Sequence, residues 1–551
     1  MQNVASRDTH CINRRQQRIY HLFQGQCGQL HVGIGALYSS QSHAGNADDG
    51  SVPDPNQLNN DSAQRLHAPR REQVSNSPLG AGEYDALGLA DLVRRGEVSP
   101  LELVDDAIRR CEAVNGTLNA VITEMFDYAR TRAREPLVDA PFAGVPFLMK
   151  DFVAEIKGVP FFEGSDFLSG YIPKQDSEIY RRFCRAGLIT IGKTNLPEFA
   201  IGTTTEPRRF GATHNPWDPT RTPGGSSGGA GAAVAARVVP MAHGNDVGGS
   251  IRIPASCCGL VGLKPTRGRT TLAPHYGDIF SGYFAEHALT RSIRDCAVLL
   301  DAIAGPDIGE PYVAPLPERP YVEEINRRVE PMKIGFSTLT PLGDPLDPEC
   351  ENAIRKTAAL CSSLGHVVVE AVPQFDAIDF WTRYTTVLAS GVAWAVADWA
   401  RRLDKEIREE YFEPFVWAFT ERGRSLSAPE YLLAIQDVQH HVRDIEQFYV
   451  DHDLWLTTTL GQPPVELGTL TYNEDPIELR RRMAMFSPYT YIANATGQPA
   501  ISLPLHWTAT DLPVGVHFTA RRGEEGMLIR LAAQLEHAAP WHARKPLIVA
   551  C

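Results

Sequence analysis

Cysteine is scarce in this sequence, and its spacing lacks the pattern of a functional site. Ten cysteines among 551 residues are too few for a disulfide scaffold. Cys257 and Cys258 are adjacent, which suits neither a zinc site nor a thioredoxin-like redox pair. We therefore interpret the cysteines as reduced, buried thiols, and we expect no metal site and a cytoplasmic protein.

Clustered positive charge and long apolar runs are also missing. The chain has 53 Lys and Arg against 66 Asp and Glu, a formal net charge of −13. Surfaces that bind nucleic acid or anionic lipid need clustered cations. No stretch approaches the roughly 18 apolar residues that cross a bilayer, since the longest, residues 230–241, is interrupted by Arg237 and Pro240. We expect no nucleic-acid partner and no membrane partner.

Residues 1–82 differ in composition from the rest of the chain. They are rich in Gln, Asn, Ser, His and Gly and have few apolar runs. The arginines among the first twenty residues form no clear amphipathic face, so an organelle-targeting segment is the weaker alternative. We expect a disordered N-terminal extension over residues 1–82, a single domain over 83–545 and a C-terminal tail over 546–551.

Strand and helix patterns alternate from residue 83 onward. Ser99-Pro100-Leu101-Glu102 predicts a helix start, with Ser as the cap, Pro in the first turn and Glu at the third position. The alternation predicts an α/β fold, in which a large mixed β-sheet is covered by helices on both faces. The expected strands are 142–149, 188–191, 333–336, 366–372, 454–458, 500–505 and 514–518. The expected helices are 178–186, 230–239, 348–364, 380–405, 428–450 and 526–537.

Residues 187–194, GLITIGKT, match the phosphate-loop pattern letter for letter. A phosphate loop must follow a strand and open a helix, so that its backbone N–H groups surround the phosphates. Here a predicted helix comes first, and Leu-Ile-Thr-Ile is itself a predicted strand. An extended chain cannot form that cradle, so a nucleotide-dependent enzyme that uses Lys193 is a weak alternative.

Two glycine-serine segments follow. Residues 224–229, GGSSGG, satisfy the G-x-S-x-G pattern of α/β-hydrolases, which requires a strand directly before the serine. Three prolines among residues 215–223 exclude an interior strand there. In the second segment, Gly248-Gly249-Ser250, the glycines leave backbone N–H groups uncovered, and such groups can surround a negative oxygen. Neither segment assigns a function alone.

Taken together, four segments resemble the amidase signature family: GVPFLMKD (144–151), TPGGSSGGAGAAVAA (222–236), GNDVGGSIRIPAS (244–256) and TGQPAISLP (496–504). The resemblance extends over about residues 83–545. It implies the amidase signature fold and a Ser-Ser-Lys triad that needs no cofactor. In that triad Ser250 is the nucleophile, Ser226 is the bridging serine after a cis peptide bond, and Lys150 is the base. The oxyanion hole would be formed by the backbone N–H groups of Val247, Gly248, Gly249 and Ser250.

The residues themselves support the assignment of Lys150. A serine hydroxyl attacks only when a neighbour takes its proton, and a lysine can do so only when it is neutral, which burial favours. We expect no pairing between Lys150 and Asp151, because adjacent residues of an extended chain point to opposite faces. Asp246 and Arg252 are expected to pair and brace the loop. His214 and His243 are interpreted as bystanders.

The reaction implied is attack on an amide carbonyl, release of an amine and hydrolysis of an acyl-enzyme. The chain lacks the RYDG-type segment of glutamyl-tRNA amidotransferase A subunits, and residues 204–218 are most similar to the 6-aminohexanoate-cyclic-dimer hydrolase branch. We therefore expect an amidase for small, uncharged linear, cyclic or aryl amides, free-standing or as a homodimer. The alternatives are an amidotransferase A-like subunit that releases ammonia from glutamine and, more weakly, a non-catalytic scaffold. Tryptophans 381, 394, 399 and 417 are expected in the core rather than in a pocket.

Overall fold

The computed structural model describes residues 73–74, 80–470 and 475–550. The chain divides into two compact units, Met1–Arg71 and Glu72–Cys551, and all of the described residues belong to the second unit. Most of the predicted N-terminal extension, residues 1–82, therefore lies outside the described residues.

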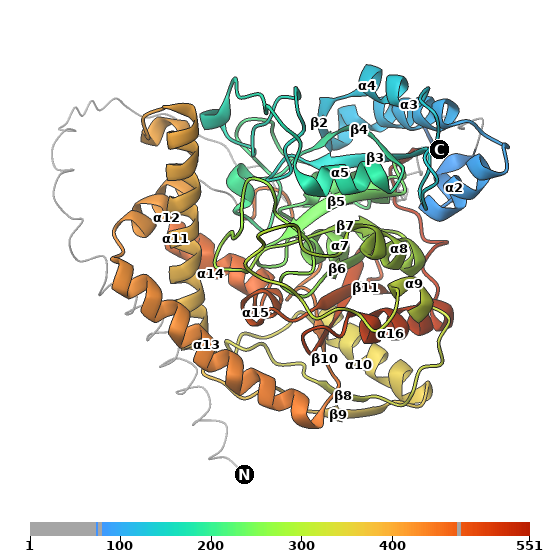
Figure 1. Cartoon of the computed structure of the whole chain (residues 1–551). Helices are drawn as coiled ribbons and strands as arrows, with labels where there is room; N and C mark the ends of the chain where they lie inside the picture. Colours follow the sequence, from blue (N-terminus) through green and yellow to red (C-terminus); the bar gives the residue numbers. More distant parts are fainter. Residues whose placement is uncertain (1–72, 75–79, 471–474, 551) are drawn as a thin grey trace, which may run out of the picture. The chain divides into compact units, whose positions relative to one another are not determined.

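An eleven-stranded sheet runs through the described part of the chain (Figure 1). Strand β3 lies between β4 and β5 and is parallel to both, and β8 is parallel to its neighbours β10 and β9. The other neighbouring strands pair antiparallel, so the sheet is mixed, as the sequence predicts. From edge to edge the strands are β2 (Val121–Glu124), β4 (Leu188–Thr194), β3 (Val145–Lys150), β5 (Met241–Asp246), β7 (Ala285–Thr290), β6 (Val261–Lys264), β11 (Ala500–Trp507), β12 (Pro513–Ala520), β10 (Leu454–Thr458), β8 (Lys333–Phe336) and β9 (Val367–Glu370).

Helices pack on both faces of the sheet, which confirms the predicted α/β class. On β5, the His243 ring lies 5.4 Å from Phe183 of α5. The opposite face of the same strand is turned toward the starts of α6 and α7, because a Cβ on Gly244 would lie 3.1 Å from Ser227 Oγ and 3.3 Å from Ile251. The helices that contact the sheet or its covering layers are α2 (Ala86–Arg94), α3 (Pro100–Leu118), α4 (Phe126–Arg132), α5 (Glu178–Arg185), α6 (Gly228–Ala235), α7 (Arg252–Cys258), α8 (Ile293–Ile303), α9 (Tyr321–Glu324), α10 (Pro348–Ser363) and α16 (Glu525–Ala538).

A second group of helices lies beside the sheet, and its longest members stand in orange at the left of Figure 1. Helix α11 contacts both α12 and α13, and α12 contacts α14. This group supplies part of the wall of the candidate site. Its members are α11 (Ala377–Leu403), α12 (Pro414–Arg424), α13 (Ala428–Asp451), α14 (Pro476–Phe486) and α15 (Thr490–Thr496); four 3-10 turns, η1 (Ala81–Glu83), η2 (Asp166–Leu168), η3 (Glu198–Ala200) and η4 (Glu409–Tyr411), complete the helical elements.

Local sequence explains the start of α3. Ser99 Oγ accepts a hydrogen bond from the Glu102 N–H at 3.2 Å, and the Glu102 carboxylate accepts one from the Ser99 N–H at 2.8 Å. Both partners of the predicted capping box are therefore satisfied, and these bonds occupy two N–H groups that the first turn of a helix leaves without acceptors.

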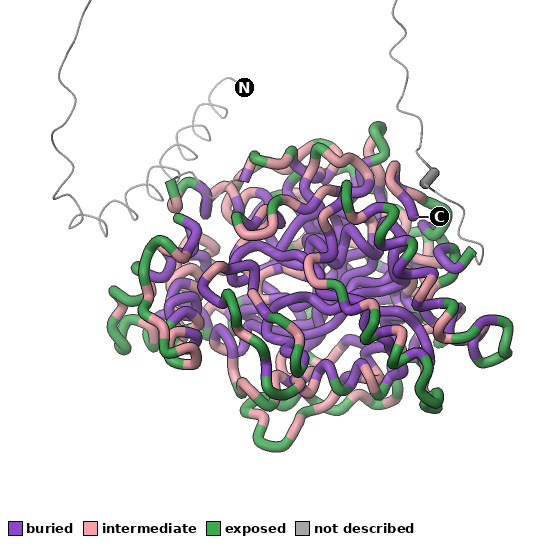
Figure 2. Tube along the Cα trace, turned by 90° about the horizontal axis from the view of Figure 1, so that it is seen from above, coloured by how far each residue is buried: buried purple, intermediate pink, exposed green. Residues whose placement is uncertain are grey.

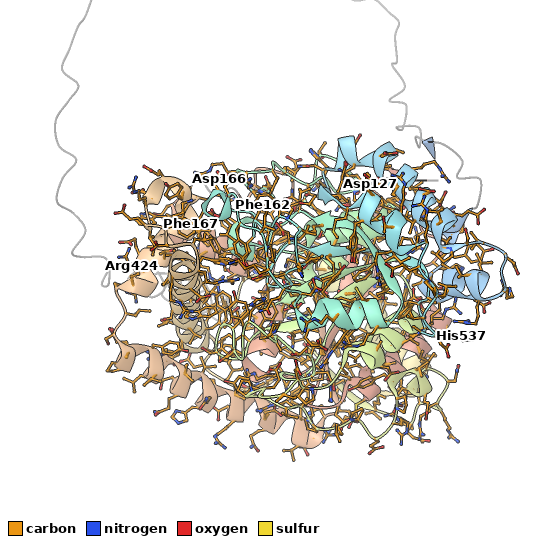
Figure 3. All side chains as sticks on the ribbon, turned by 45° about the horizontal axis from the view of Figure 1, so that its top comes forward. Asp127, Phe162, Asp166, Phe167, Arg424 and His537 are labelled. Carbon is orange, nitrogen blue, oxygen red and sulfur yellow. The ribbon has the colours of Figure 1, made fainter. Side chains whose placement is uncertain are left out.

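The buried core follows the sheet. Figure 2 shows the buried chain concentrated in the middle of the molecule and the exposed chain along its rim. Polar side chains such as those of Asp127, Arg424 and His537 project from the periphery (Figure 3). Within the described residues, no helix has the length and apolar character that a membrane crossing requires.

The two predicted domain boundaries need correction. Ala81 and Gly82 are buried, and the Gly82 carbonyl accepts hydrogen bonds from Arg237 at 3.1 Å and Arg291 at 2.6 Å. At the other end, β13 (Val549–Ala550), within the predicted tail 546–551, pairs with β1 (Gln73–Val74). The folded unit therefore begins before residue 83 and continues beyond residue 545.

The phosphate-loop alternative is wrong. Residues 188–194 form the buried strand β4, which is extended and cannot surround a phosphate. Lys193 is buried in an ion pair with Asp151, and its Nζ donates to the Pro160 carbonyl at 3.1 Å. This lysine is therefore engaged within the core.

Candidate active site

Two neighbouring parallel strands, β3 and β5, bring polar groups together at their carboxyl ends. Lys150 is the last residue of β3, and Asn245 stands near the end of β5. The carboxyl ends of neighbouring parallel strands lie side by side, and α/β proteins commonly bind ligands there. Ser226, just before α6, reaches the same place, so that Lys150 Nζ lies 2.7 Å from Ser226 Oγ and 2.6 Å from Asn245 Oδ1.

Ser250 lies in the turn between β5 and α7 and lines the same cavity as Ser226. The Ser227 N–H donates to the Ser250 carbonyl at 3.3 Å, which holds the two serine segments side by side. The peptide bond between Gly225 and Ser226 is cis. Of the three predicted site residues, Lys150 and Ser226 are thus in direct contact, and Ser250 shares the cavity wall with Ser226.

Lys150 is completely buried, and its direct side-chain partners are uncharged. Burial lowers the pKa of Lys150 to about 7, against smaller opposing effects of Glu286, Asp246 and Glu163. Asp151 pairs with Lys193 instead of Lys150, as its position on the chain predicts. A substantial fraction of the Lys150 amine is therefore neutral near pH 7, unlike a free lysine.

Asn245 is a contact of Lys150 that the sequence analysis missed. Its Nδ2 donates to the Phe152 carbonyl at 3.2 Å, which turns its Oδ1 toward Lys150. The sequence offered one clue to Asn245, which is that its amide side chain stands next to Asp246 and shortly before Gly248-Gly249-Ser250. Nothing in that pattern specifies a lysine as its partner, because the contact joins residues 95 positions apart.

The two histidines differ in their relation to the site. His243 Nδ1 accepts a hydrogen bond from the Lys150 backbone N–H at 3.2 Å, and its Nε2 lies 2.7 Å from the Glu286 carboxylate. It therefore holds the main chain of Lys150. His214 Nδ1 lies 2.6 Å from the Pro219 carbonyl and is not among the residues that line the cavity.

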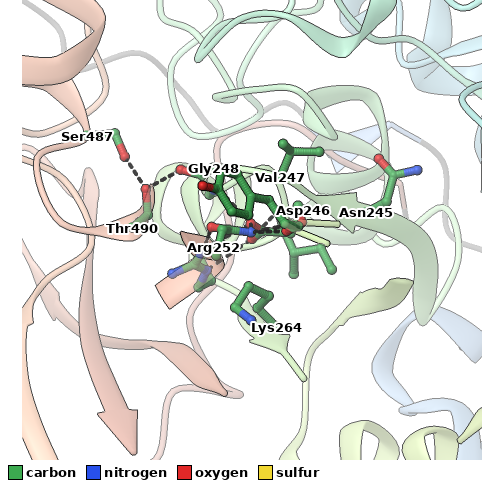
Figure 4. A network of polar contacts seen from close by, with 12 residues as sticks. Asn245, Asp246, Val247, Gly248, Arg252, Lys264, Ser487 and Thr490 are labelled. Atoms are coloured by element: carbon green, nitrogen blue, oxygen red, sulfur yellow. Dashed lines mark hydrogen bonds and ion pairs between the residues drawn. The ribbon is translucent and has the colours of Figure 1, made fainter. Parts of the chain in front are cut away.

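A buried ion pair braces the turn that carries Ser250 (Figure 4). Arg252 donates to Asp246 through Nε at 3.0 Å and Nη2 at 2.9 Å, which confirms the expected pair. Burial alone would raise the pKa of Asp246, but the Arg252 guanidinium outweighs it and holds this pKa well below its usual range. The same carboxylate accepts from the Ile251 N–H at 3.1 Å, so the turn is fixed from inside.

One member of the predicted oxyanion hole needs correction. The Gly249 N–H donates to Asp246 at 2.7 Å and is therefore occupied. In the part of the chain that the structure describes, the N–H groups of Val247, Gly248 and Ser250 have no hydrogen-bond acceptor. These three line the cavity, so they are the donors left for an incoming oxygen.

The cavity wall is mainly apolar and aromatic, and α11, α12 and α14 contribute to it. Of the four tryptophans of the helical group, none lines this cavity in the described structure. Trp381 and Trp399 are buried in the core, as the sequence predicts, whereas Trp394 is 40% exposed. The large apolar and aromatic lining residues are Phe152, Phe199, Ile201, Ile253, Phe280, Tyr384, Leu388, Phe415, Met483 and Tyr491.

Comparisons with known proteins identify the family of this chain. The family model described as Amidase matches residues 102–529. The 6-aminohexanoate-cyclic-dimer hydrolase of Paenarthrobacter ureafaciens is 38% identical over 479 residues, covering 84% of this chain and 97% of that protein. The homologue of the same description from Pseudomonas sp. (strain NK87) is 37% identical over the same shares.

Solved structures give the same result. A structure of 6-aminohexanoate cyclic dimer hydrolase has a TM-score of 0.80 at 37% identity, over 85% of this chain and 99% of that one. A bacterial aryl acylamidase of the amidase signature family has a TM-score of 0.75 at 26% identity, over 83% and 96%. The chain belongs to the amidase family, and it is an enzyme that hydrolyses carbon–nitrogen bonds in amides.

Proposed function

We propose that this amidase works through Ser250, Ser226 and Lys150. The observation that carries the proposal is the 2.7 Å contact between Lys150 Nζ and Ser226 Oγ, at the cavity that Ser250 lines. A buried lysine whose direct partners are a hydroxyl and an amide is suited to accept a proton. Removal of the Ser250 proton requires such an acceptor, because a serine hydroxyl is a weak nucleophile by itself.

The proton path runs from Ser250 to Ser226 and from Ser226 to neutral Lys150. Ser250 Oγ then bonds to the amide carbon, and the carbonyl oxygen takes the negative charge. The N–H groups of Val247, Gly248 and Ser250 stabilise that charge, each contributing about 3–4 kcal/mol to barrier lowering. Protonated Lys150 returns the proton through Ser226 to the leaving amine as the C–N bond breaks. Water hydrolyses the acyl-enzyme by the same steps.

We propose small linear, cyclic or aryl amides as substrates. The support is the apolar and aromatic cavity wall, together with relatives whose names specify a cyclic dimer and an aryl acylamide. The seven cysteines that the structure describes form no disulfide, which supports a reducing compartment such as the cytoplasm.

A panel of purified wild-type and variant proteins on linear, cyclic and aryl amides tests this function. Ser250→Ala is expected to abolish turnover and acyl-enzyme formation. Ser226→Ala is expected to lower kcat by about 10²–10⁴-fold in a folded protein, and the losses are not expected to add, because the residues act as one unit. Full activity of Ser250→Ala would contradict the mechanism. Strict dependence on glutamine and a second protein would instead support the amidotransferase A-like alternative.

A further inference from the structure

Arg480 is a buried cation in the wall of the active-site cavity. It lies on α14, is only 9% exposed and is the one charged side chain among the cavity-lining residues that the structure describes. Its Nη2 donates a long hydrogen bond to Thr385 at 3.4 Å. Its Nε is buried and has no acceptor. The guanidinium is therefore held in place but poorly satisfied.

Among the residues that the structure describes, aromatic faces and no carboxylate surround Arg480. Its guanidinium carbon lies 5.1 Å from the Trp381 ring centre and 6.0 Å from that of Tyr384. Such cation–π contacts stabilise the guanidinium, but by less than the burial of an unpaired ion costs. Arg252, a buried arginine outside the cavity wall, has its carboxylate partner Asp246. Within the described part of the chain, Arg480 has neither a carboxylate partner nor backbone carbonyl acceptors such as those that satisfy Arg291.

A second unsatisfied donor lines the same cavity. The Tyr491 hydroxyl is buried and has no hydrogen-bond partner, and the Tyr491 ring lies 5.0 Å from that of Tyr384. An arginine and a tyrosine hydroxyl together present donors, and arginine offers no acceptor at all. A ligand that satisfies both must bring acceptor atoms, and a ligand that offsets the buried charge must bring negative charge.

We propose that Arg480 and Tyr491 bind a carboxylate group of the substrate, which the substrate carries in addition to its scissile amide. The inference rests on the proposed amide hydrolysis, and it names the substrate class more narrowly. The apolar side chains of Leu388 and Met483 also line this cavity, and they suit a methylene chain between the two polar ends. The proposal differs here from the uncharged amides that the sequence led us to expect.

The experiment compares matched pairs of amides that differ only in this group. On the acyl side, the mono-4-nitroanilides of malonic to adipic acid are paired with anilides in which a methyl group replaces the carboxylate. On the amine side, N-butyryl derivatives of glycine to 6-aminohexanoate are paired in the same way. The readout is the kcat/KM for the carboxylate amide divided by the kcat/KM for its methyl counterpart, called the ratio below. We expect the wild-type enzyme to favour the carboxylate in at least one pair.

Variants assign that preference to the proposed residues. Arg480→Met is expected to lower the ratio by roughly 10- to 100-fold, mainly through KM, because a charge-assisted hydrogen bond is lost. Tyr491→Phe is expected to lower it less. Arg481→Met is the matched control, because Arg481 is the next residue of α14 and pairs with Glu478 at the surface; its ratio is expected to stay unchanged.

Two further measurements keep the inference separate from the proposed function. Calorimetry of the same carboxylate anilides with Ser250→Ala protein is expected to detect binding that Ser250→Ala/Arg480→Met protein loses, whether or not the wild type turns them over. The melting temperature of Arg480→Met is expected to be unchanged or higher, since an unpaired buried charge is removed. A ratio that favours the methyl partner in every pair, or one that Arg480→Met leaves unchanged, would overturn the inference. Absence of all amide hydrolysis with intact carboxylate binding would overturn only the proposed function.

Discussion

At the scale of the residue, the sequence predicted the type of each reactive group better than its surroundings. Lys150, Ser226 and Ser250 belong to long and specific sequence motifs, so the contact of Lys150 with Ser226 and the cavity that Ser226 and Ser250 line could be expected. Asn245 and the occupied Gly249 N–H could not, because each depends on a contact that only the fold creates. Residue chemistry specifies what a group can do, and its partners determine whether it does so.

The first prediction concerns the protonation of Lys150. Because burial lowers its pKa to about 7, the amine is protonated below that pH and neutral above it. As the mechanism needs the neutral amine, kcat/KM is expected to rise about tenfold per pH unit up to pH 7 and then level off. Steady-state rates between pH 5 and 9.5 measure this. A rate that keeps rising toward pH 10 would mean that Lys150 titrates like a free lysine.

The second prediction concerns Asn245, a positioning residue that acts through Lys150. Asn245→Asp places a carboxylate 2.6 Å from the amine, so it stabilises the charged form and is expected to move the midpoint of the pH profile upward by about one to three pH units. Asn245→Ala removes the acceptor without adding charge. It is expected to lower the rate with no upward shift. Equal midpoints in the wild type and Asn245→Asp would show that this contact does not tune Lys150.

At the scale of the element, regular patterns predicted well and polar or glycine-rich strands did not. Strands β8 and β10 have the expected bounds, 333–336 and 454–458. Their sequences, KIGF and LWLTT, are short and mainly apolar, which is typical of a buried strand. Strand β5, with sequence MAHGND, was missed. It lacks β-branched side chains and is extended because β3 and β7 pair with it on either side. Strand β5, which carries Asn245 beside Lys150, is thus one of four strands of the sheet that the sequence did not predict; the others are β2, β6 and β7.

The third prediction tests why α6 consists of small residues. A Cβ on Gly229 would lie 2.5 Å from the Asn195 nitrogen and 2.6 Å from the Ala120 oxygen, both backbone atoms. Gly229→Ala must therefore displace α6 from the sheet, and overpacking of this kind costs about 1–3 kcal/mol. Since Ser226 precedes α6, a loss of rate is expected with the loss of stability. Thermal unfolding and kcat/KM measure the two effects.

Gly116 of α3 provides the control for Gly229. A Cβ there meets no atom within 4 Å, and alanine is the better helix former by about 0.5–1 kcal/mol. Gly116→Ala is therefore expected to keep its activity and to unfold at the same or a higher temperature. If both variants behaved alike, helix propensity rather than close packing would govern α6.

At the scale of the whole molecule, contacts between sequence-distant ends determine where the folded unit begins. The Glu83 carboxylate pairs with Arg237 at 2.8 Å and with Lys545 at 2.7 Å. Asp85 caps α2 and also binds Arg294 of α8. Composition could mark the change in character near residue 83, but it could not detect that Gly82 satisfies buried arginines. The partners lie 155 and 209 residues away in the chain.

The last prediction separates the two candidate boundaries by truncation. Removal of residues 1–71, the whole of the first unit, is expected to leave the melting temperature and kcat/KM close to those of the full chain. Removal of residues 1–85 also deletes the Gly82 carbonyl, the Glu83 carboxylate and the cap of α2. Arg237 would then lose two of its acceptors while it stays buried, and an unsatisfied buried group costs about 1–3 kcal/mol, more when it is charged. The shorter protein is therefore expected to melt several degrees lower. Equal melting temperatures for the two truncated proteins would place the start of the stable domain after residue 85. Loss of activity in the protein that lacks only residues 1–71 would mean that the first unit contributes to the enzyme.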